Sequence, residues 1–229
     1  PPFACSAFIS TLSLSGTTSG SGITYQWQSS PDNITWTDIS GATSYNLTTS
    51  QTAATNYRLR ATCGGATSES VPLSLGMNAD ITTCYCVPPT TDCSVDDVIT
   101  NVTIGSINNT TTCTTGGYTN YGTTGQPDTL VLGNNYPISV TVGPGGTEYV
   151  SIWIDYNKNG LFESTEFTAL GSGNGVTISG TISVPASALV GTTRMRVRVS
   201  YNAALTGADA CLGYTYGETE DYKVEIVCL

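Results

Sequence analysis

Histidine is absent from the chain, and only 10% of its 229 residues are charged. Without an imidazole, Ser-His-Asp and Cys-His nucleophilic sites and His-ligated zinc hydrolases are excluded. Paired carboxylates remain as catalysts, as in glycosidases, but the acidic residues of this chain cluster with the spacing of calcium ligands. The composition therefore favours a protein that is not an enzyme.

Basic residues are scarce too, with 7 Lys and Arg against 17 Asp and Glu and a net charge of −10. This charge disfavours nucleic acid and anionic membranes as partners and favours calcium. No apolar run approaches the roughly 20 residues of a membrane span. Because the chain opens at Pro1-Pro2 with neither a basic nor an apolar leader, we expect a mature protein or an excised segment of one.

Sustained helical periodicity is lacking, whereas short alternating runs rich in β-branched and aromatic residues recur between turn signals. The run at 57–63 alternates throughout, and the arginine-rich run at 193–200 does the same. The sequence predicts an all-β protein of two β-sandwich domains. We expect the first at 1–78, a cysteine- and proline-rich joint at 79–97, and the larger second domain at 98–229.

Eight cysteines in a Thr/Ser-rich chain favour disulfides formed in an oxidising compartment, so we expect a secreted or cell-surface protein. Cys5 with Cys63 is the expected bridge of the first domain, and a Cys86–Cys93 bridge is one possibility in the joint. A metal site in the joint is the alternative. The six cysteines beyond the first domain admit 15 pairings. The candidates are Cys5, Cys63, Cys84, Cys86, Cys93, Cys113, Cys211 and Cys228.

The segment 155–166 has the spacing of a calcium loop. Oxygen-bearing side chains occupy its first, third and fifth positions, a glycine the sixth and a glutamate the twelfth. The preceding residues favour a strand, so this is not an EF-hand, and we expect calcium in a structural role. A polar turn without an ion is the alternative. The predicted ligands are Asp155, Asn157, Asn159, Leu161 through its carbonyl, Glu163 and Glu166.

Three carboxylates lie within four residues at 218–221 and require nearby cations. Three arginines share one face of the 193–200 strand, so the sequence predicts an ion-pair ladder between the two strands. The alternatives are that one carboxylate completes the calcium shell, that the arginines form a solvated strand face, or that they bind acidic glycans. The ladder residues are Arg194, Arg196, Arg198, Glu218, Glu220 and Asp221.

The first domain resembles an immunoglobulin-like fold. The segments Tyr25–Pro31, Trp36, Gly41–Thr43, Tyr57-Arg58 and Cys63-Gly64 are similar to Ig-like modules repeated in large secreted proteins of Gram-negative bacteria. We expect Trp27 in the core, whereas Trp36 is open to either packing or ligand binding.

The second domain resembles the GEVED domain in the segments Trp153–Gly160, Gly191–Val197 and Tyr216–Tyr222. Its Gly-Glu-Val-Glu-Asp signature differs here only in Thr219. The resemblance implies a jelly-roll-like, non-catalytic extracellular module of proteins exported by the type IX system. In such bacteria the Asp128-Thr129-Leu130 motif is similar to an O-glycosylation site, which would place sugar on Thr129.

Two functions follow from these interpretations. The first is a calcium-stabilised, disulfide-linked adhesion, surface-appendage or extracellular-assembly module whose partners are glycans, other surface proteins or copies of itself. The alternative is a glycan-binding or positioning module of a larger secreted peptidase or glycan-degrading enzyme. A carboxylate-based hydrolase is the third and least favoured hypothesis.

Overall fold

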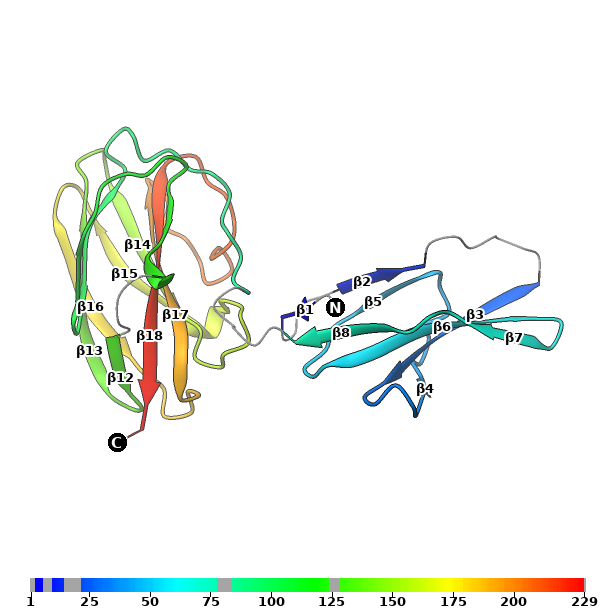
Figure 1. Cartoon of the computed structure of the whole chain (residues 1–229). Helices are drawn as coiled ribbons and strands as arrows, with labels where there is room; N and C mark the ends of the chain where they lie inside the picture. The colour runs from blue at the N-terminus through cyan, green and yellow to red at the C-terminus, as the bar shows by residue number, and fades with distance from the viewer. Residues whose placement is uncertain (1–2, 6–9, 15–21, 78–83, 124–127, 229) are drawn as a thin grey trace. The chain divides into compact units, whose positions relative to one another are not determined.

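The computed structural model describes residues 3–5, 10–14, 22–77, 84–123 and 128–228. The chain divides into two compact units, Pro1–Thr83 and Cys84–Leu229. Figure 1 shows that both units are built of strands joined by loops, which confirms the predicted all-β class and its sandwich domains. Among the described residues, no helix is both long and apolar enough to cross a membrane.

The first unit contains a six-stranded sheet of order β1-β8-β6-β3-β4, with β7 paired to β6, and a separate β2-β5 pair. Its strands are β1 (Phe3–Ala4), β2 (Ser10–Ser13), β3 (Ile23–Ser30), β4 (Thr37–Asp38), β5 (Asn46–Thr49), β6 (Thr55–Cys63), β7 (Ala66–Glu69) and β8 (Leu73–Met77). Leucines of β2 and β5 share one apolar cluster with residues of β3, β6 and β8, so the two sheets form the layers of a small sandwich.

Trp27 lies at the centre of that core and is 3% exposed, as predicted. Its indole nitrogen donates to the Ser44 carbonyl at 3.0 Å, which satisfies the polar end of the buried ring. Leu59 pairs with Trp27 across β3 and β6. Leu59, which is 2% exposed, therefore packs in the core beside Trp27.

The second unit is a larger sandwich, with ten strands among its described residues. They are β9 (Ile99–Ile104), β10 (Ile107–Thr110), β11 (Tyr118–Asn120), β12 (Asp128–Val131), β13 (Asn135–Val142), β14 (Glu148–Ile154), β15 (Phe167–Gly173), β16 (Thr177–Ser183), β17 (Gly191–Tyr201) and β18 (Gly217–Val227), with short 3-10 turns η2 (Tyr121–Thr123) and η3 (Ser164–Glu166).

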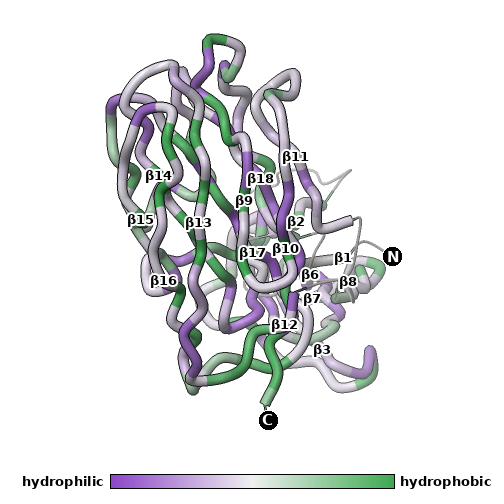
Figure 2. The backbone as a smooth tube through the Cα atoms, turned by 90° about the vertical axis from the view of Figure 1, so that its left-hand side faces the viewer, coloured by the Kyte–Doolittle hydropathy of each residue, from purple (hydrophilic) through white to green (hydrophobic). Residues whose placement is uncertain are grey.

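These strands form a four-stranded sheet, β10-β9-β13-β16, and a six-stranded sheet, β11-β18-β17-β14-β15, with β12 also paired to β18. Alternate residues point inward, so Val102 and Val140 of one sheet face Val150 and Val199 of the other in a continuous apolar core. Figure 2 shows hydrophobic and hydrophilic segments following one another along these strands. Both β11 and β12 run parallel to β18, a pairing without a local sequence signal.

A second, smaller apolar cluster covers the outer face of the six-stranded sheet. Trp153 is its buried centre, and Tyr85, Phe162 and Ala210 pack around it. Trp153 belongs to β14, whereas Tyr85, Phe162 and Ala210 come from three connecting segments, which therefore bury this face of the sheet as well.

The predicted joint at 79–97 has a different boundary. Residues 78–83 lie outside the described part, but from Cys84 onward the segment belongs to the second unit. Tyr85 is buried in the outer cluster, and Asp92 forms an isolated parallel bridge with Tyr216. Residues 84–97 are thus part of the second unit and pack against the outer face of its six-stranded sheet.

The expected cysteine pairings are wrong. Cys86 pairs with Cys211, and Cys93 pairs with Cys113, so no Cys86–Cys93 bridge exists. Cys63 is free and exposed, and therefore does not pair with Cys5; Cys228 is also free and exposed. Cys5 and Cys84 are both disulfide-bonded. A sequence separation of 125 residues between Cys86 and Cys211 explains why local spacing did not predict their pairing.

Candidate calcium loop and buried arginine layer

The 155–166 loop connects β14 to its antiparallel neighbour β15. Trp153 pairs with Phe167 where the two strands meet the loop, and η3 forms the last turn. The loop is therefore the closed end of a β-hairpin, in keeping with the β-branched and aromatic residues that precede it.

Asp155 is fully buried at the start of the loop. Its Oδ2 accepts hydrogen bonds from the Tyr85 hydroxyl at 2.7 Å and the Gly160 amide at 2.9 Å, and its Oδ1 accepts one from the Asn159 amide at 3.2 Å. Thr193 of β17 donates to the Asp155 carbonyl at 2.6 Å. Burial raises the pKa of Asp155, whereas these hydrogen bonds oppose that rise. The carboxyl group is thereby fixed in one orientation.

Two asparagines continue the turn. Asn157 Oδ1 accepts from the Asn159 amide at 3.0 Å, and Asn159 Oδ1 accepts from the Leu161 amide at 2.8 Å. Lys158 and Gly160 have positive φ angles of 55° and 81°, so the backbone coils tightly beneath these oxygens. The glycine at the sixth position thus has the conformational role that the spacing predicts.

Glu166 closes the loop from its C-terminal end and is also buried. Its Oε1 accepts from the Tyr156 amide at 2.8 Å and the Asn157 amide at 3.3 Å, while its Oε2 accepts from the Glu163 amide at 3.1 Å. Burial, with a further contribution from nearby Asp155, raises the pKa of Glu166 to about 7. Two buried carboxyl groups that disfavour each other's charge would both be stabilised by a cation.

These residues fit a calcium ion. Glu166 accepts three hydrogen bonds, and a carboxylate has about four lone-pair sites, so Glu166 retains a free acceptor position. Glu163 also faces the loop, since its Oε2 accepts from Asn157 Nδ2 at 2.5 Å. Among the described residues, no three His, Cys, Asp or Glu side chains gather as a metal site. Calcium here would need amide oxygens, the Leu161 carbonyl and water besides the carboxylates.

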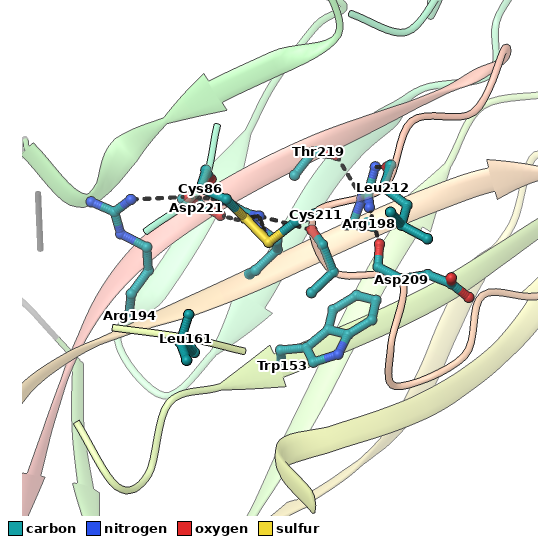
Figure 3. The surroundings of a disulfide bond; sticks show 12 residues. Cys86, Trp153, Leu161, Arg194, Arg198, Asp209, Cys211, Leu212, Thr219 and Asp221 are labelled. Atoms are coloured by element: carbon teal, nitrogen blue, oxygen red, sulfur yellow. Dashed lines mark hydrogen bonds and ion pairs between the residues drawn. A yellow bond between two sulfur atoms is a disulfide. The ribbon is translucent and has the colours of Figure 1, made fainter. Parts of the chain in front are cut away.

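The arginine layer, which comprises Arg194, Arg196, Arg198 and Asp221, lies on the outer face of the same sheet. Asp221 forms a bidentate ion pair with Arg196, whose Nε donates to Oδ1 at 2.7 Å and whose Nη2 donates to Oδ2 at 2.8 Å. Asp221 Oδ2 also accepts from Arg194 Nη1 at 3.2 Å. Figure 3 shows Asp221 beside the Cys86–Cys211 disulfide, with the interaction from Arg194 reaching it. Two antiparallel strands thus share one buried ionic centre.

Arg196 is fully buried and also donates to the carbonyls of Cys86 at 2.7 Å and Ala210 at 2.8 Å. Arg198 donates to Thr219 Oγ1 at 3.0 Å and to the carbonyls of Asp209 and Leu212. The guanidinium groups therefore fasten the covering segments onto the sheet. All three arginines are buried, so they form neither a solvated strand face nor a site for acidic glycans.

Two members of the predicted ladder are misplaced. Glu218 and Glu220 lie on the inner face of β18 with Tyr222, whereas Asp221 and the arginines lie on the outer face. Successive strand residues point to opposite sides, so the carboxylates of 218–221 could not all face one arginine row. The same alternation that identified the arginine face would have separated them.

The inner glutamates have polar partners of another kind. Glu218 Oε2 accepts from the Ile99 amide at 3.0 Å and thereby links the two sheets, while Glu220 Oε2 accepts from the Tyr222 hydroxyl at 2.6 Å. Burial is the main cause that raises the pKa of both, to about 7 for Glu220. Within the signature run, Asp221 therefore binds the arginines on the outer face, and Glu218 binds β9 of the opposite sheet.

Tyr85 is a functional residue that the sequence did not indicate. It lies 70 positions before Asp155, its hydroxyl binds that carboxylate, and Arg194 stacks over its ring at 4.6 Å. Burial and Asp155 both raise the pKa of Tyr85, which keeps the hydroxyl protonated as a donor. The tyrosine thus connects the 155–166 loop to the arginine layer.

The remaining predicted residues lie at the surface. Thr129 is exposed on β12 between two buried neighbours. Trp36 is half-buried in the first unit, with the Arg58 guanidinium stacked 4.3 Å from its ring centre. Arg60 and Asp38 form an exposed ion pair on the same sheet.

Comparisons with solved structures give low similarity. The FN1–FN3 domains of chicken CNTN1 are 14% identical, with 98% of this chain and 65% of that one covered and a TM-score of 0.27. The BSP domain of a biofilm associated protein is 12% identical, with 89% of this chain and 25% of that one covered and a TM-score of 0.22. The chain thus spans less than two thirds of the length of either structure. A search of curated proteins finds no match.

Family models match both units. A domain of unknown function, DUF8696, matches residues 4–75. The GEVED domain model matches residues 149–225, which include the 155–166 loop, the arginine layer and the signature run at the start of β18. The second unit of this chain therefore contains a GEVED domain.

Proposed function

We propose that the chain is a non-catalytic extracellular module that serves adhesion, a surface appendage or an extracellular assembly, and that calcium and disulfides stabilise it. The observation that carries this proposal is that its main charged side chains are buried and held by hydrogen bonds. Asp155, Glu166, Arg196 and Asp221 are buried and hydrogen-bonded into one covered face of a sheet. Such an arrangement suits a rigid building block better than a site that must admit substrate.

Calcium would be held by Asp155, Asn157, Asn159 and Glu166, with Glu163 and the Leu161 carbonyl completing the oxygen set. The ion would supply positive charge to the two buried carboxyl groups of the loop. The chain's own residues already orient these carboxyl groups through backbone amides and Tyr85. Calcium would therefore stabilise a turn that is largely formed beforehand.

The calcium part is tested by the melting temperature. At a calcium concentration one hundred times the dissociation constant, binding adds about 2.7 kcal/mol to stability. We expect a chelator to lower the melting temperature, calcium to restore it, and magnesium alone to fail. Glu166→Gln should weaken this response, whereas Glu69→Gln, the same change on exposed β7, should preserve it in full. An equal response in both variants contradicts a site at this loop.

The assembly part is tested on the full chain in calcium. Analytical ultracentrifugation and electron microscopy should detect oligomers or filaments if copies of the chain are the partners. Binding to surface proteins or to host and bacterial glycans, measured with immobilised chain, would support adhesion instead. A monomer that binds none of these would contradict the proposal.

Export to the cell surface is part of the same proposal. Disulfides persist in oxidising compartments, and six of the eight cysteines are disulfide-bonded. The GEVED match supports export by the type IX system, and the small first sandwich supports an Ig-like role as a spacer or adhesive unit. Loss of surface antigen in a strain without that secretion system would support this route.

A glycan-binding accessory module is the second candidate, and Trp36 favours it. This half-buried ring lies beside Arg58, which donates to Gln28 at 2.8 Å, so an aromatic surface borders a row of ordered polar groups. Glycans pack on such aromatic faces and hydrogen-bond to the neighbouring polar groups. Trp36→Ala should abolish glycan-array binding while leaving the melting temperature of the second unit unchanged; retained binding would contradict this site.

A further inference from the structure

Two acidic side chains lie buried together at the other end of β14. Glu148, the first residue of the strand, is fully buried, and Asp97, just before β9, is 3% exposed. Asp155 follows Glu148 by seven positions along the strand, a distance of roughly 24 Å at about 3.4 Å per residue. This pair is therefore distinct from the 155–166 loop.

Glu148 differs from the other buried carboxyl groups of the unit. Within the described residues, neither of its oxygens accepts a hydrogen bond from a protein N–H or hydroxyl group, and neither does Oδ1 of the adjacent Asp97. Glu218, Glu220 and Asp128 also have an unpartnered oxygen, but in each the second oxygen accepts a hydrogen bond. Burial, a side-chain hydrogen bond with Asp97 and the charge of Asp97 raise the pKa of Glu148 to about 8, so the pair does not carry two charges unless a cation replaces the proton between them.

The two loops around this pair bring further oxygens close. A Cβ atom on Gly145 would lie 2.5 Å from Asp97 Oδ1 and 2.7 Å from the Val95 carbonyl oxygen, so both oxygens converge on the same point. A Cβ on Gly143 would overlap the Asp96 carbonyl oxygen. Glycine at both positions thus lets the 143–146 turn approach a segment that presents carboxylate and carbonyl oxygens.

We propose that Asp97 and Glu148 bind a second divalent cation of the calcium type, independently of the 155–166 loop. Two carboxylates match its charge, and the unpartnered oxygens supply ligand positions that no protein donor occupies. Calcium suits this set because it accepts carboxylates and backbone carbonyls in irregular geometry, whereas magnesium demands a near-octahedral shell and retains waters. The ion would join the 94–97 segment to the first residue of β14.

The test counts calcium ions on the full chain by native mass spectrometry and calorimetry. Glu148→Gln and Asp97→Asn should each bind one ion fewer than the wild type, and Glu69→Gln should bind the same number. Glu166→Gln should lose the loop ion and retain this one. If Glu166→Gln loses none, the loop site fails, while the loss in Glu148→Gln still supports the second site.

A wild-type crystal soaked in terbium avoids any folding defect of the variants. An anomalous peak between Glu148 and Asp97 supports the site, and the absence of a peak there overturns it. Unchanged calcium binding by both variants would also overturn it. The proposal would also be overturned if Glu148→Gln raised the melting temperature above that of the wild type by the same amount with and without calcium. Glu148 and Asp97 would then share a proton in the wild type instead of a cation.

Discussion

At the scale of single residues, Asp221 is the carboxylate that pairs with two buried arginines of the second unit. It neutralises Arg196 with a two-point interaction and also contacts Arg194 and the Tyr118 hydroxyl. A guanidinium group is never deprotonated at ordinary pH, so its burial is tolerated only with a fixed anion and satisfied donors.

Asp221→Asn should therefore destabilise the second unit strongly. Removing one partner leaves a buried charge uncompensated, which costs about 3–5 kcal/mol. Urea denaturation of the wild type and variant would measure the difference. Asp38→Asn is the control, because the Arg60–Asp38 pair is 33% and 51% exposed and such pairs contribute about 1 kcal/mol or less. Similar losses in the two variants would contradict a buried ionic centre.

Glu220 should make stability depend on pH. Burial, with Glu218 alongside, raises its pKa from 4.5 to about 7, so the folded state favours the protonated form. Stability is then fully present below pH 4.5 and declines as pH rises through 7, by about 3 kcal/mol in all. The other titratable groups that face it are Tyr222 and Tyr121.

Glu220→Gln should remove this part of the pH dependence and be more stable than the wild type at pH 8. The measurement is the difference in unfolding free energy between the two proteins at several pH values in saturating calcium. A difference that does not change between pH 4.5 and 8 would show that Glu220 is not the titrating group.

At the scale of elements, β18 depends on the glycine that begins it. Gly217 has a φ of 139°, and a Cβ there would overlap the Val199 carbonyl oxygen on β17 and lie 2.6 Å from the Tyr214 ring. The first residue of the signature run is thus a glycine because the chain enters the strand against its neighbour's backbone.

Gly217→Ala should cost about 3 kcal/mol, since an unfavourable φ and a backbone clash add together. Gly133→Ala is the matched control: its φ is 73°, but no atom lies within 4 Å of the new Cβ, so only about 1 kcal/mol is expected. Thermal unfolding of both variants would compare them. Equal losses would mean that the contact with β17 is relieved cheaply.

At the scale of the whole molecule, the two assigned disulfides close loops of very different length. Cys86–Cys211 spans 125 residues and Cys93–Cys113 spans 20. In the chain-entropy model they stabilise the fold by about 4.9 and about 3.3 kcal/mol. We expect Cys86→Ser with Cys211→Ser to lower the free energy of unfolding more than Cys93→Ser with Cys113→Ser. The reverse order would indicate that native-state packing, not loop length, dominates.

Much of this architecture could be predicted from the sequence because its signals are local. Alternation along 193–200 identified the buried strand and its arginine face, and the spacing of 155–166 identified a turn with inward oxygens. Trp27 was recognisable as core from its place in an alternating run. Each of these patterns lies within about a dozen consecutive residues.

The remaining features depend on contacts between distant residues. Tyr85 meets Asp155 across 70 positions, and Asp97 meets Glu148 across two loops, with no motif at either end. The partner of Cys86 was missed for the same reason, whereas Cys63 is a free cysteine. The error at Glu218 and Glu220 was different, since the alternation of side chains along a strand already places them on the face opposite to Asp221.

The Cys86–Cys211 bridge also has a mechanical consequence. Tension applied at Tyr85 and at Cys228 would pass through the disulfide directly into the segment after Cys211, which contains β18. Residues 87–210 lie outside that load path. Because β18 is bonded to β17 over its length and to β11 and β12 on its other edge, these bonds would be loaded in shear.

Pulled in this way, the second unit should lengthen by no more than about 60 Å, the reach of the 17 residues between Cys211 and Cys228. Force spectroscopy with handles at these two points would measure the step, and reduction of the disulfide should replace it with one several times longer. An oxidised domain of this kind would lengthen under load only by the chain that follows Cys211, because the disulfide keeps residues 87–210 outside the load path.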